Sequence, residues 1–205
     1  MKKITFLLTA LTALIVLNSF RLPSDGYQVG DKVADFKLTN VDGKTVSLAD
    51  NQAAKGYIVV FTCNTCPVAQ AYEDRIIALN QKYAAKGYPV IAINPNDPTI
   101  AAGDSFEKMK QRATSKQYAF PYLVDENQQV AKAYGARSTP HVFIVTRTGN
   151  DFTVAYIGAI DNNSEDEAAA SKKFVEAAME DILAGKPASV NFTKAVGCSI
   201  KWKKA

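Results

Sequence analysis

The stretch "VVFTCNTCPVAQAYEDRI", Val59 to Ile76, runs from an apolar strand into a helix, with Cys63 and Cys66 at the junction. Tyr57 to Thr62 has the apolar composition of a buried strand. The residues after it give a helix of about five turns one apolar face, at 3-4-3-4 spacing: Ala69, Tyr72, Ile76, Leu79 and Tyr83. A cysteine pair at such a junction is a redox pair, half of a metal site or a structural disulfide.

The rest of the chain predicts further elements in α/β order. A hairpin signal, Asp42-Gly43, precedes the cysteines. After them we expect a strand at 88–94 and then a helix that begins at a capping box formed by Asp104 and Glu107. The strand "FPYLVD" and the helix "ENQQVAKAYG" follow, and then two strands around Gly149-Asn150. The last predicted helix begins at a second capping box, Ser164 and Glu167, and ends at about Ala184. Parallel strands joined by crossovers and closed by an antiparallel hairpin predict a three-layer α/β/α sandwich with an N-terminal β-hairpin and an inserted helix.

The domain organisation is predicted to be simple. Residues 25–185 are expected to form one domain, with residues 186–205 as a tail packed on it. A chain of 205 residues, 47% apolar and 21% charged, can bury a core without disulfide staples. The net charge of +4 forms no basic stripe interleaved with aromatic residues, so nucleic acid is not an expected partner.

The N-terminus predicts export. Lys2 and Lys3 precede the apolar run Ile4–Leu17, which has signal-peptide length and is shorter than a bilayer span. Residues 1–22 are therefore expected to be a signal peptide, or an uncleaved anchor that would be the chain's only membrane contact; a buried N-terminal helix is the other alternative. A periplasmic or other extracytoplasmic location follows, where disulfides persist. Three cysteines are an odd number, so at least one is a free or transiently paired thiol.

Cys63 and Cys66 are interpreted as a redox dithiol. On this reading Cys63 stands at the helix start and Cys66 one turn inside the helix. Unpaired N–H groups and the macrodipole acidify a thiol there, which makes Cys63 the attacking thiolate and Cys66 the resolving thiol. Pro67 suits the first helical turn. A structural role is the weaker interpretation, because a disulfide across two residues removes little chain entropy.

A second motif, Thr139-Pro140, stands directly before a buried strand. A proline cannot continue a central ladder, so it belongs at the beginning of that strand. A cis bond there would turn the backbone of Thr139 outward as an edge for an extended substrate peptide. An ordinary trans proline is the alternative.

The chain resembles the peroxiredoxin-like, thioredoxin-fold proteins of bacteria. The resemblance covers about Val29 to Lys203 and rests on these stretches: "FTCNTCPVAQAYEDRI", "VIAINPNDP", "DSFEKMKQRA", "FPYLVDENQQVAKAYGARSTPHVFI", "IGAIDNN" and "VGCSIKWK". It implies a thioredoxin fold, the dithiol Cys63 and Cys66, and Pro140 in cis. The chain departs from thioredoxins, since Asn64-Thr65 replaces their Gly-Pro, and it lacks the P-x-x-x-T-x-x-C pattern of typical peroxiredoxins.

Three further residues are accessory candidates. His141 follows Pro140 and is either a ligand or a base that tunes Cys63, or a half-buried strand residue. Arg137 either orients a peroxide or is a solvated charge. Cys198 either returns to the site as a third redox thiol or lies buried against Trp202, and burial is slightly favoured.

The sequence therefore predicts an exported thiol–disulfide oxidoreductase without a cofactor. Its partners would be protein disulfides or dithiols and an unidentified redox partner. One alternative is a copper or zinc carrier that uses Cys63, Cys66 and His141. A thiol peroxidase is the second alternative.

Overall fold

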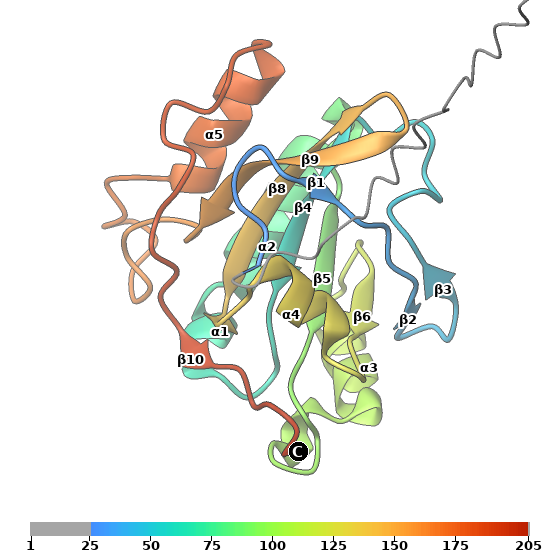
Figure 1. Cartoon of the computed structure of the whole chain (residues 1–205). Coiled ribbons are helices and arrows are strands. Elements are labelled where there is room, and N and C mark those ends of the chain that lie inside the picture. Colours follow the sequence, from blue (N-terminus) through green and yellow to red (C-terminus); the bar gives the residue numbers. More distant parts are fainter. Residues whose placement is uncertain (1–25, 205) are drawn as a thin grey trace, which may run out of the picture.

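The computed structural model describes residues 26–204. At its centre lies an eight-stranded mixed sheet in the order β1-β9-β8-β4-β5-β6-β2-β3 (Figure 1). The strands are β1 (Lys32–Val33), β2 (Leu38–Asn40), β3 (Thr45–Val46), β4 (Gly56–Phe61), β5 (Val90–Asn94), β6 (Tyr122–Val124), β8 (His141–Thr148) and β9 (Asp151–Gly158). Strands β4, β5 and β6 are parallel neighbours, and β8 runs antiparallel to β4. β7 (Ser138–Thr139) and β10 (Cys198–Ser199) form a separate two-stranded sheet.

Helices cover both faces of the sheet. They are α1 (Pro67–Ala71), α2 (Glu73–Tyr83), α3 (Phe106–Ser115), α4 (Gln129–Tyr134) and α5 (Phe174–Leu183), with 3-10 helices η1 (Ala84–Lys86) and η2 (Ala102–Asp104). Residues of α2, α3 and α5 share one hydrophobic cluster, and residues of α4 and of the N-terminal segment share the other. Figure 1 shows α4 in front of the sheet and α2 behind it. The predicted three-layer α/β class is confirmed.

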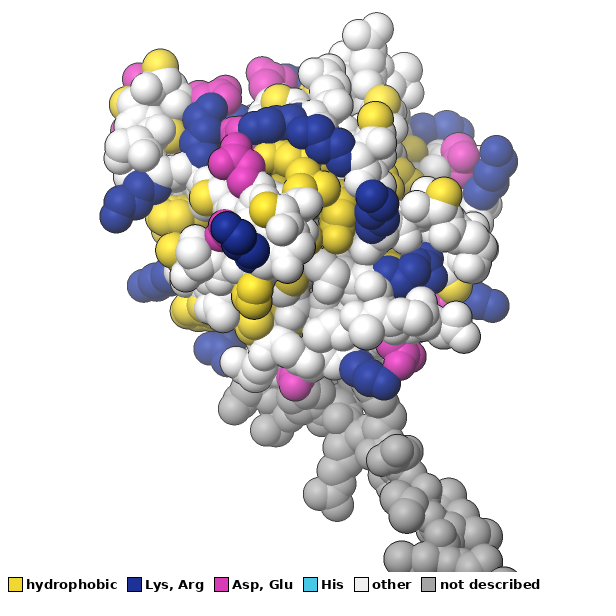
Figure 2. Space-filling view, turned by 90° about the horizontal axis from the view of Figure 1, so that it is seen from above, with side chains coloured by type: hydrophobic (Ala, Val, Ile, Leu, Met, Phe, Trp, Pro, Cys, Tyr) yellow, Lys and Arg dark blue, Asp and Glu magenta, His cyan; other side chains and the backbone are white. Residues whose placement is uncertain are grey.

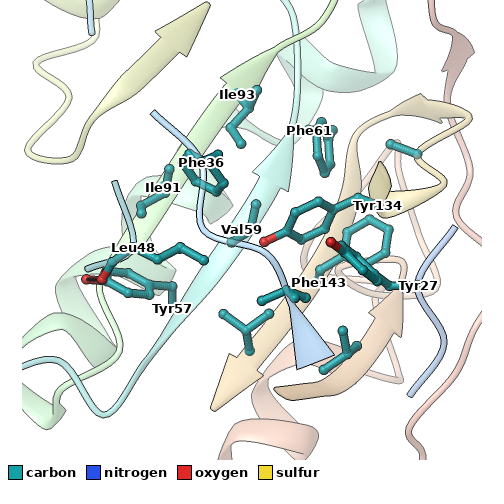
Figure 3. Packing of buried hydrophobic residues seen from close by; sticks show 14 of the residues in the cluster. Tyr27, Phe36, Leu48, Tyr57, Val59, Phe61, Ile91, Ile93, Tyr134 and Phe143 are labelled. Atoms are coloured by element: carbon teal, nitrogen blue, oxygen red, sulfur yellow. Dashed lines mark hydrogen bonds between the residues drawn. The ribbon is translucent and has the colours of Figure 1, made fainter. Parts of the chain in front are cut away.

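The central strand β4 explains why two cores form. All six of its residues are buried. Because successive side chains of a strand point to opposite faces, Val59 and Phe61 enter one cluster while Ile58 and Val60 enter the other. In the first cluster, the ring of Phe61 packs against Tyr134 and Phe143 (Figure 3).

The helix after β4 is divided in two. The predicted apolar positions are all buried, but α1 ends at Ala71 and α2 begins at Glu73. The N–H of Tyr72 is shared between the carbonyl oxygens of Val68 and Ala69, both at 3.2 Å, so the chain tightens at this point. Gly87 ends η1 in a left-handed conformation, at the predicted stop.

Both predicted capping boxes are wrong. The N-cap of α3 is Ser105, and the carboxylate of Asp104 turns inward to other partners, described below. The last helix begins at Phe174 rather than at Ser164. The side chain of Asn163 accepts the N–H groups of the residues that follow it, which holds a turn where the helix was expected.

The C-terminal segment contains short pieces of paired backbone. Ile157 forms a bridge with Phe192, and β10 pairs with β7. The predicted leader or anchor, residues 1–22, lies outside the described residues. Within residues 26–204 no helix has the length and apolarity that a bilayer span requires.

The end of the molecule opposite to β10 carries charges of both signs. Figure 2 shows Lys and Arg side chains around a hydrophobic area, with Asp and Glu side chains among them. On this face the positive charge is not gathered into one basic patch.

Candidate active site

The two neighbouring cysteines lie in the connection from β4 to α1. Cys66 is the N-cap of α1, and its sulfur accepts the N–H of Ala69 at 3.4 Å. Pro67 occupies the first helical turn, as predicted. Cys63 precedes the N-cap by three residues and lies in the loop. The prediction that Cys63 stands at the helix start with Cys66 a turn inside is therefore wrong by one helical turn.

The thiol of Cys63 is buried, with 3% of the residue exposed. Burial raises its pKa, and the nearby carboxylate of Asp104 raises it further. The Thr139 hydroxyl, 3.1 Å from the sulfur, lowers the pKa by less than burial raises it but by more than Asp104 does, and the backbone N–H groups of Thr65 and Cys66 lower it least. The predicted acidified thiolate is thus not what this structure shows. Burial instead favours the protonated thiol of Cys63, and the hydroxyl of Thr139 is the group in hydrogen-bond distance of its sulfur.

The Thr139-Pro140 motif lies against both sulfurs. The peptide bond between these residues is cis. The carbonyl oxygen of Thr139 is 3.3 Å from the sulfur of Cys66. The predicted open edge at Thr139 is not free, however, because Cys198 of β10 pairs with it in antiparallel register.

Cys198 forms a disulfide with Cys66, across 132 residues of sequence, with the Cα atoms 5.8 Å apart. Cys63 is the unpaired cysteine of the three. The predicted pairing of Cys63 with Cys66 is therefore not the one in this structure. Burial of Cys198 against Trp202, the slightly favoured interpretation, is also wrong; the ring of Trp202 instead lies under the amine of Lys132, 5.8 Å from it.

A buried carboxylate organises the loop that carries Cys63. Asp104 is 2% exposed and accepts four hydrogen bonds. Its oxygens bind the N–H of Asn64 at 2.6 Å, the hydroxyl of Thr65 at 2.6 Å, and the side-chain amides of Asn94 at 3.1 Å and Asn96 at 2.8 Å. Both residues between the cysteines are thereby fixed. Sequence reasoning missed this role, although the polar residues after β5 could have drawn attention to it.

His141 and Arg137 belong to another place. They line a cavity of about 550 Å³ with Tyr134 and Phe143, and its lining does not include Cys63 or Cys66. The ring of His141 packs on Phe143 at 4.7 Å between centroids. Neither residue is among the groups that shift the pKa of Cys63. The structure therefore does not place His141 as its base or Arg137 beside it.

The alternative metal site is not assembled. In residues 26–204, no group of three or more His, Cys, Asp or Glu side chains is arranged to hold a metal ion. Cys66 is bonded to Cys198 in a disulfide, and His141 lines the cavity described above. The alternative prediction, a metal site formed by Cys63, Cys66 and His141, is therefore not supported by the positions of these residues.

The buried imidazole of His141 makes the stability of the fold depend on pH. Burial, with a smaller contribution from Arg137, lowers the pKa of His141 to about 4, from an ordinary value of 6.5. The unfolded chain therefore takes up a proton on this residue below pH 6.5, and the folded chain does so only near pH 4. Stability is lost as the pH falls through this window. We expect His141→Gln to lose less thermal stability than wild type between pH 7 and pH 5, measured by calorimetry. Parallel losses would contradict this assignment.

Comparison with known proteins identifies the family. Residues 29–150 match the model of the AhpC/TSA family. The chain belongs to this family. An uncharacterized conserved protein from Geobacillus kaustophilus has a solved structure with a TM-score of 0.80 and 35% sequence identity, covering 89% of this chain and 96% of that one.

A second relative has a named activity. Thiol-disulfide oxidoreductase ResA of Geobacillus thermodenitrificans (strain NG80-2) is 26% identical over 149 residues, which cover 71% of this chain and 79% of that protein. This similarity confirms the predicted enzyme class, an oxidoreductase. An exposed lipoprotein thioredoxin from Streptococcus pneumoniae strain TIGR4 is 22% identical, with a TM-score of 0.52 over 64% of this chain and 93% of that one. This likeness confirms the thioredoxin-like fold.

Proposed function

We propose that this AhpC/TSA-family chain is an exported thiol–disulfide oxidoreductase that acts on protein disulfides, with Cys63 as the attacking thiol. The observation that carries the proposal is the position of Cys63. Its free sulfur lies 3.1 Å from the hydroxyl of Thr139, next to the cis Thr139-Pro140 bond and three residues before Cys66. The curated relative of named activity supports the reaction class.

The reaction is an exchange of disulfides. The thiolate of Cys63 attacks one sulfur of the substrate disulfide, and the other substrate sulfur leaves as a thiolate and takes a proton. Cys66, when reduced, attacks the sulfur of Cys63 and releases the second substrate thiol. Two electrons pass to the substrate, and a Cys63–Cys66 disulfide remains. The same steps in reverse oxidise a substrate dithiol.

The hydroxyl of Thr139 and the N–H groups of Thr65 and Cys66 assist the first step. The Thr139 hydroxyl is within hydrogen-bond distance of the sulfur of Cys63, and all three groups lower the pKa of this thiol and so favour its thiolate. The raised pKa keeps the thiol protonated at rest. A buried, protonated sulfur is protected from unspecific oxidation, because the thiolate is the reactive form.

The experiment measures reduction of a protein disulfide by the full chain, with dithiothreitol as reductant. We expect Cys63→Ser to fall to the rate of dithiothreitol alone, because a hydroxyl does not replace the thiolate as nucleophile. Cys66→Ser that is first reduced and then mixed with the substrate after removal of dithiothreitol should accumulate mixed disulfides at Cys63. Thr62→Ser is the matched control, since it trims the neighbouring buried residue and keeps all three thiols. Equal rates for wild type and Cys63→Ser would refute the proposal.

The proposed location rests on the sequence of the leader. Lys2, Lys3 and the apolar run Ile4–Leu17 have the pattern of an export signal. An extracytoplasmic compartment also suits a chain that contains a disulfide. Fractionation of cells that express the full chain tests this, and recovery only in the cytoplasm would contradict it.

A thiol peroxidase remains the second candidate prediction, and no contact in the site favours it. It requires oxidation of Cys63 by peroxide far faster than that of a free thiol, which stopped-flow measurement on the reduced protein decides.

A further inference from the structure

The segment that carries Cys198 is attached at both ends. We call residues 194–200 the strap. Before the strap, the N–H of Thr193 donates to the carbonyl oxygen of Ile157 at 2.9 Å. After it, the N–H of Lys201 donates to the side-chain oxygen of Asn96 at 2.9 Å. Neither anchor involves a cysteine, so the strap holds Cys198 near the site independently of the disulfide.

The strap lies close against the Thr139 backbone. Cys198 pairs with Thr139, and the N–H of Ile200 donates to the carbonyl oxygen of Arg137 at 3.3 Å. At Gly197, an added Cβ would lie 2.1 Å from the carbonyl oxygen of Thr139, which no real side chain tolerates. The strap therefore occupies the edge that a substrate peptide would use, and it does so at contact distance.

The three cysteines differ in their access to solvent. Cys63 and Cys66 are each 3% exposed, whereas Cys198 is partly exposed. Of the three cysteines, Cys198 is therefore the residue that a thiol from solution is expected to reach first. Cys63, Cys66 and Cys198 also share one small cluster, so all three sulfurs are neighbours.

We propose that Cys198 is a third redox cysteine, and that the disulfide moves between Cys63–Cys66 and Cys66–Cys198. This rests on the proposed function and extends it, because it names the thiol through which an external reductant enters the site. Oxidation left on Cys63 and Cys66 by a substrate passes to Cys66 and Cys198. Cys63 then returns to its free, buried form, which is the arrangement in this structure.

The exchange balances without any additional oxidant. The thiolate of Cys198 attacks the sulfur of Cys66, the bond between Cys63 and Cys66 breaks, and its electron pair leaves on Cys63, which takes a proton. One disulfide and one thiol stand on each side, so no electrons are gained or lost. The two anchors keep Cys198 at a high effective concentration, so the intramolecular attack needs no encounter in solution.

Peptide mapping of the oxidised full chain tests the proposal without any substrate. The pH is raised from about 6 to about 9, two values on either side of the ordinary thiol pKa. Samples are quenched with acid at a series of times, and their free thiols are blocked with N-ethylmaleimide. The protein is then digested with trypsin. Cys63 and Cys66 fall in one peptide and Cys198 in another. A cross-linked pair with blocked Cys63 marks Cys66–Cys198, and a separate blocked Cys198 peptide marks Cys63–Cys66.

We expect both species in wild type, with proportions that change after the jump. Cys63→Ser should retain only the cross-linked pair, and Cys198→Ser only the disulfide within the first peptide. Ser199→Ala is the matched control, because it changes the exposed neighbour on the same strand and keeps the thiols. A cross-linked pair as the sole oxidised species of wild type at every time would overturn the proposal and leave Cys66–Cys198 as a fixed staple.

A second measurement separates this result from the proposed function. Reduction of the oxidised proteins by glutathione should be slower for Cys198→Ser than for wild type, because both remaining sulfurs are buried. Equal rates would refute Cys198 as the point of entry. If exchange occurs but the full chain does not reduce protein disulfides, the proposed function fails and the role of Cys198 stands.

Discussion

Asp104→Asn should destabilise the fold and, at the same time, make Cys63 more reactive. The asparagine keeps one acceptor oxygen and turns an amide donor towards two groups that are themselves donors. Two hydrogen bonds to a charged group are then lost, each contributing about 1.5–3 kcal/mol. We expect the free energy of unfolding to fall by about 3 kcal/mol or more. Equilibrium unfolding in urea measures this loss, as a midpoint at a lower urea concentration.

The gain in reactivity follows from charge. The carboxylate of Asp104 raises the pKa of Cys63, so its removal lowers that pKa and increases the thiolate fraction at a given pH. The alkylation rate of Cys63, measured against pH in a Cys66→Ser, Cys198→Ser background in which Cys63 is the sole cysteine, should have its midpoint shifted towards lower pH. Asp97→Asn is the control, since Asp97 is also buried and is not among the groups that shift this pKa. A midpoint unchanged or shifted upward would contradict the assigned effect of Asp104.

Arg75→Met should produce the largest loss of stability of any single substitution considered for the scaffold. The guanidinium of Arg75 is 2.7 Å from Asp161, and the two side chains are only 7% and 3% exposed. Removal of one partner leaves a buried carboxylate without its cation, at a cost of about 3–5 kcal/mol. For a domain of this size that lowers the melting temperature by roughly 10 °C.

Two comparisons make this second prediction specific. The double variant Arg75→Met with Asp161→Leu removes both charges and should recover a large part of the loss, although the Tyr72 hydroxyl also loses its acceptor. Lys32→Met breaks an exposed ion pair with Asp151, whose side chains are 64% and 53% exposed, and should change stability by less than about 1 kcal/mol. Similar losses for Arg75→Met and Lys32→Met would contradict the argument from burial.

The fold was predictable wherever a pattern in the sequence depends on neighbouring residues alone. Strand β4 follows from its continuous apolar run and lies within one residue of its predicted position, and the 3-4-spaced apolar positions located the helical region, although it is divided into α1 and α2. The predicted capping boxes are wrong because a side-chain acceptor hydrogen-bonds to whichever donors the fold brings close to it, and these donors need not belong to its own helix. Asp104 bonds to Asn64, which is 40 residues away, rather than to its own helix.

The sequence predicted where the candidate site lies, but not which cysteines form its disulfide. The junction of strand and helix, with Pro140 before a buried strand, marked the place. The partner of Cys66 could not be read from local spacing, because Cys198 is 132 residues away on a strand of two residues. The burial that raises the pKa of Cys63 is also a property of the assembled fold, and the helix-start argument alone gave the opposite sign.

The strap also has a consequence for biosynthesis. Residues 194–203 follow every other described element in the chain, yet they close the site through Cys198 and through the bond from Lys203 to Gln128. Since synthesis proceeds from the N-terminus, the sheet and its helices can assemble while this closing piece is still being made. The order of synthesis thus allows a stage in which Cys63 and Cys66 are uncovered together, before Cys198 is made.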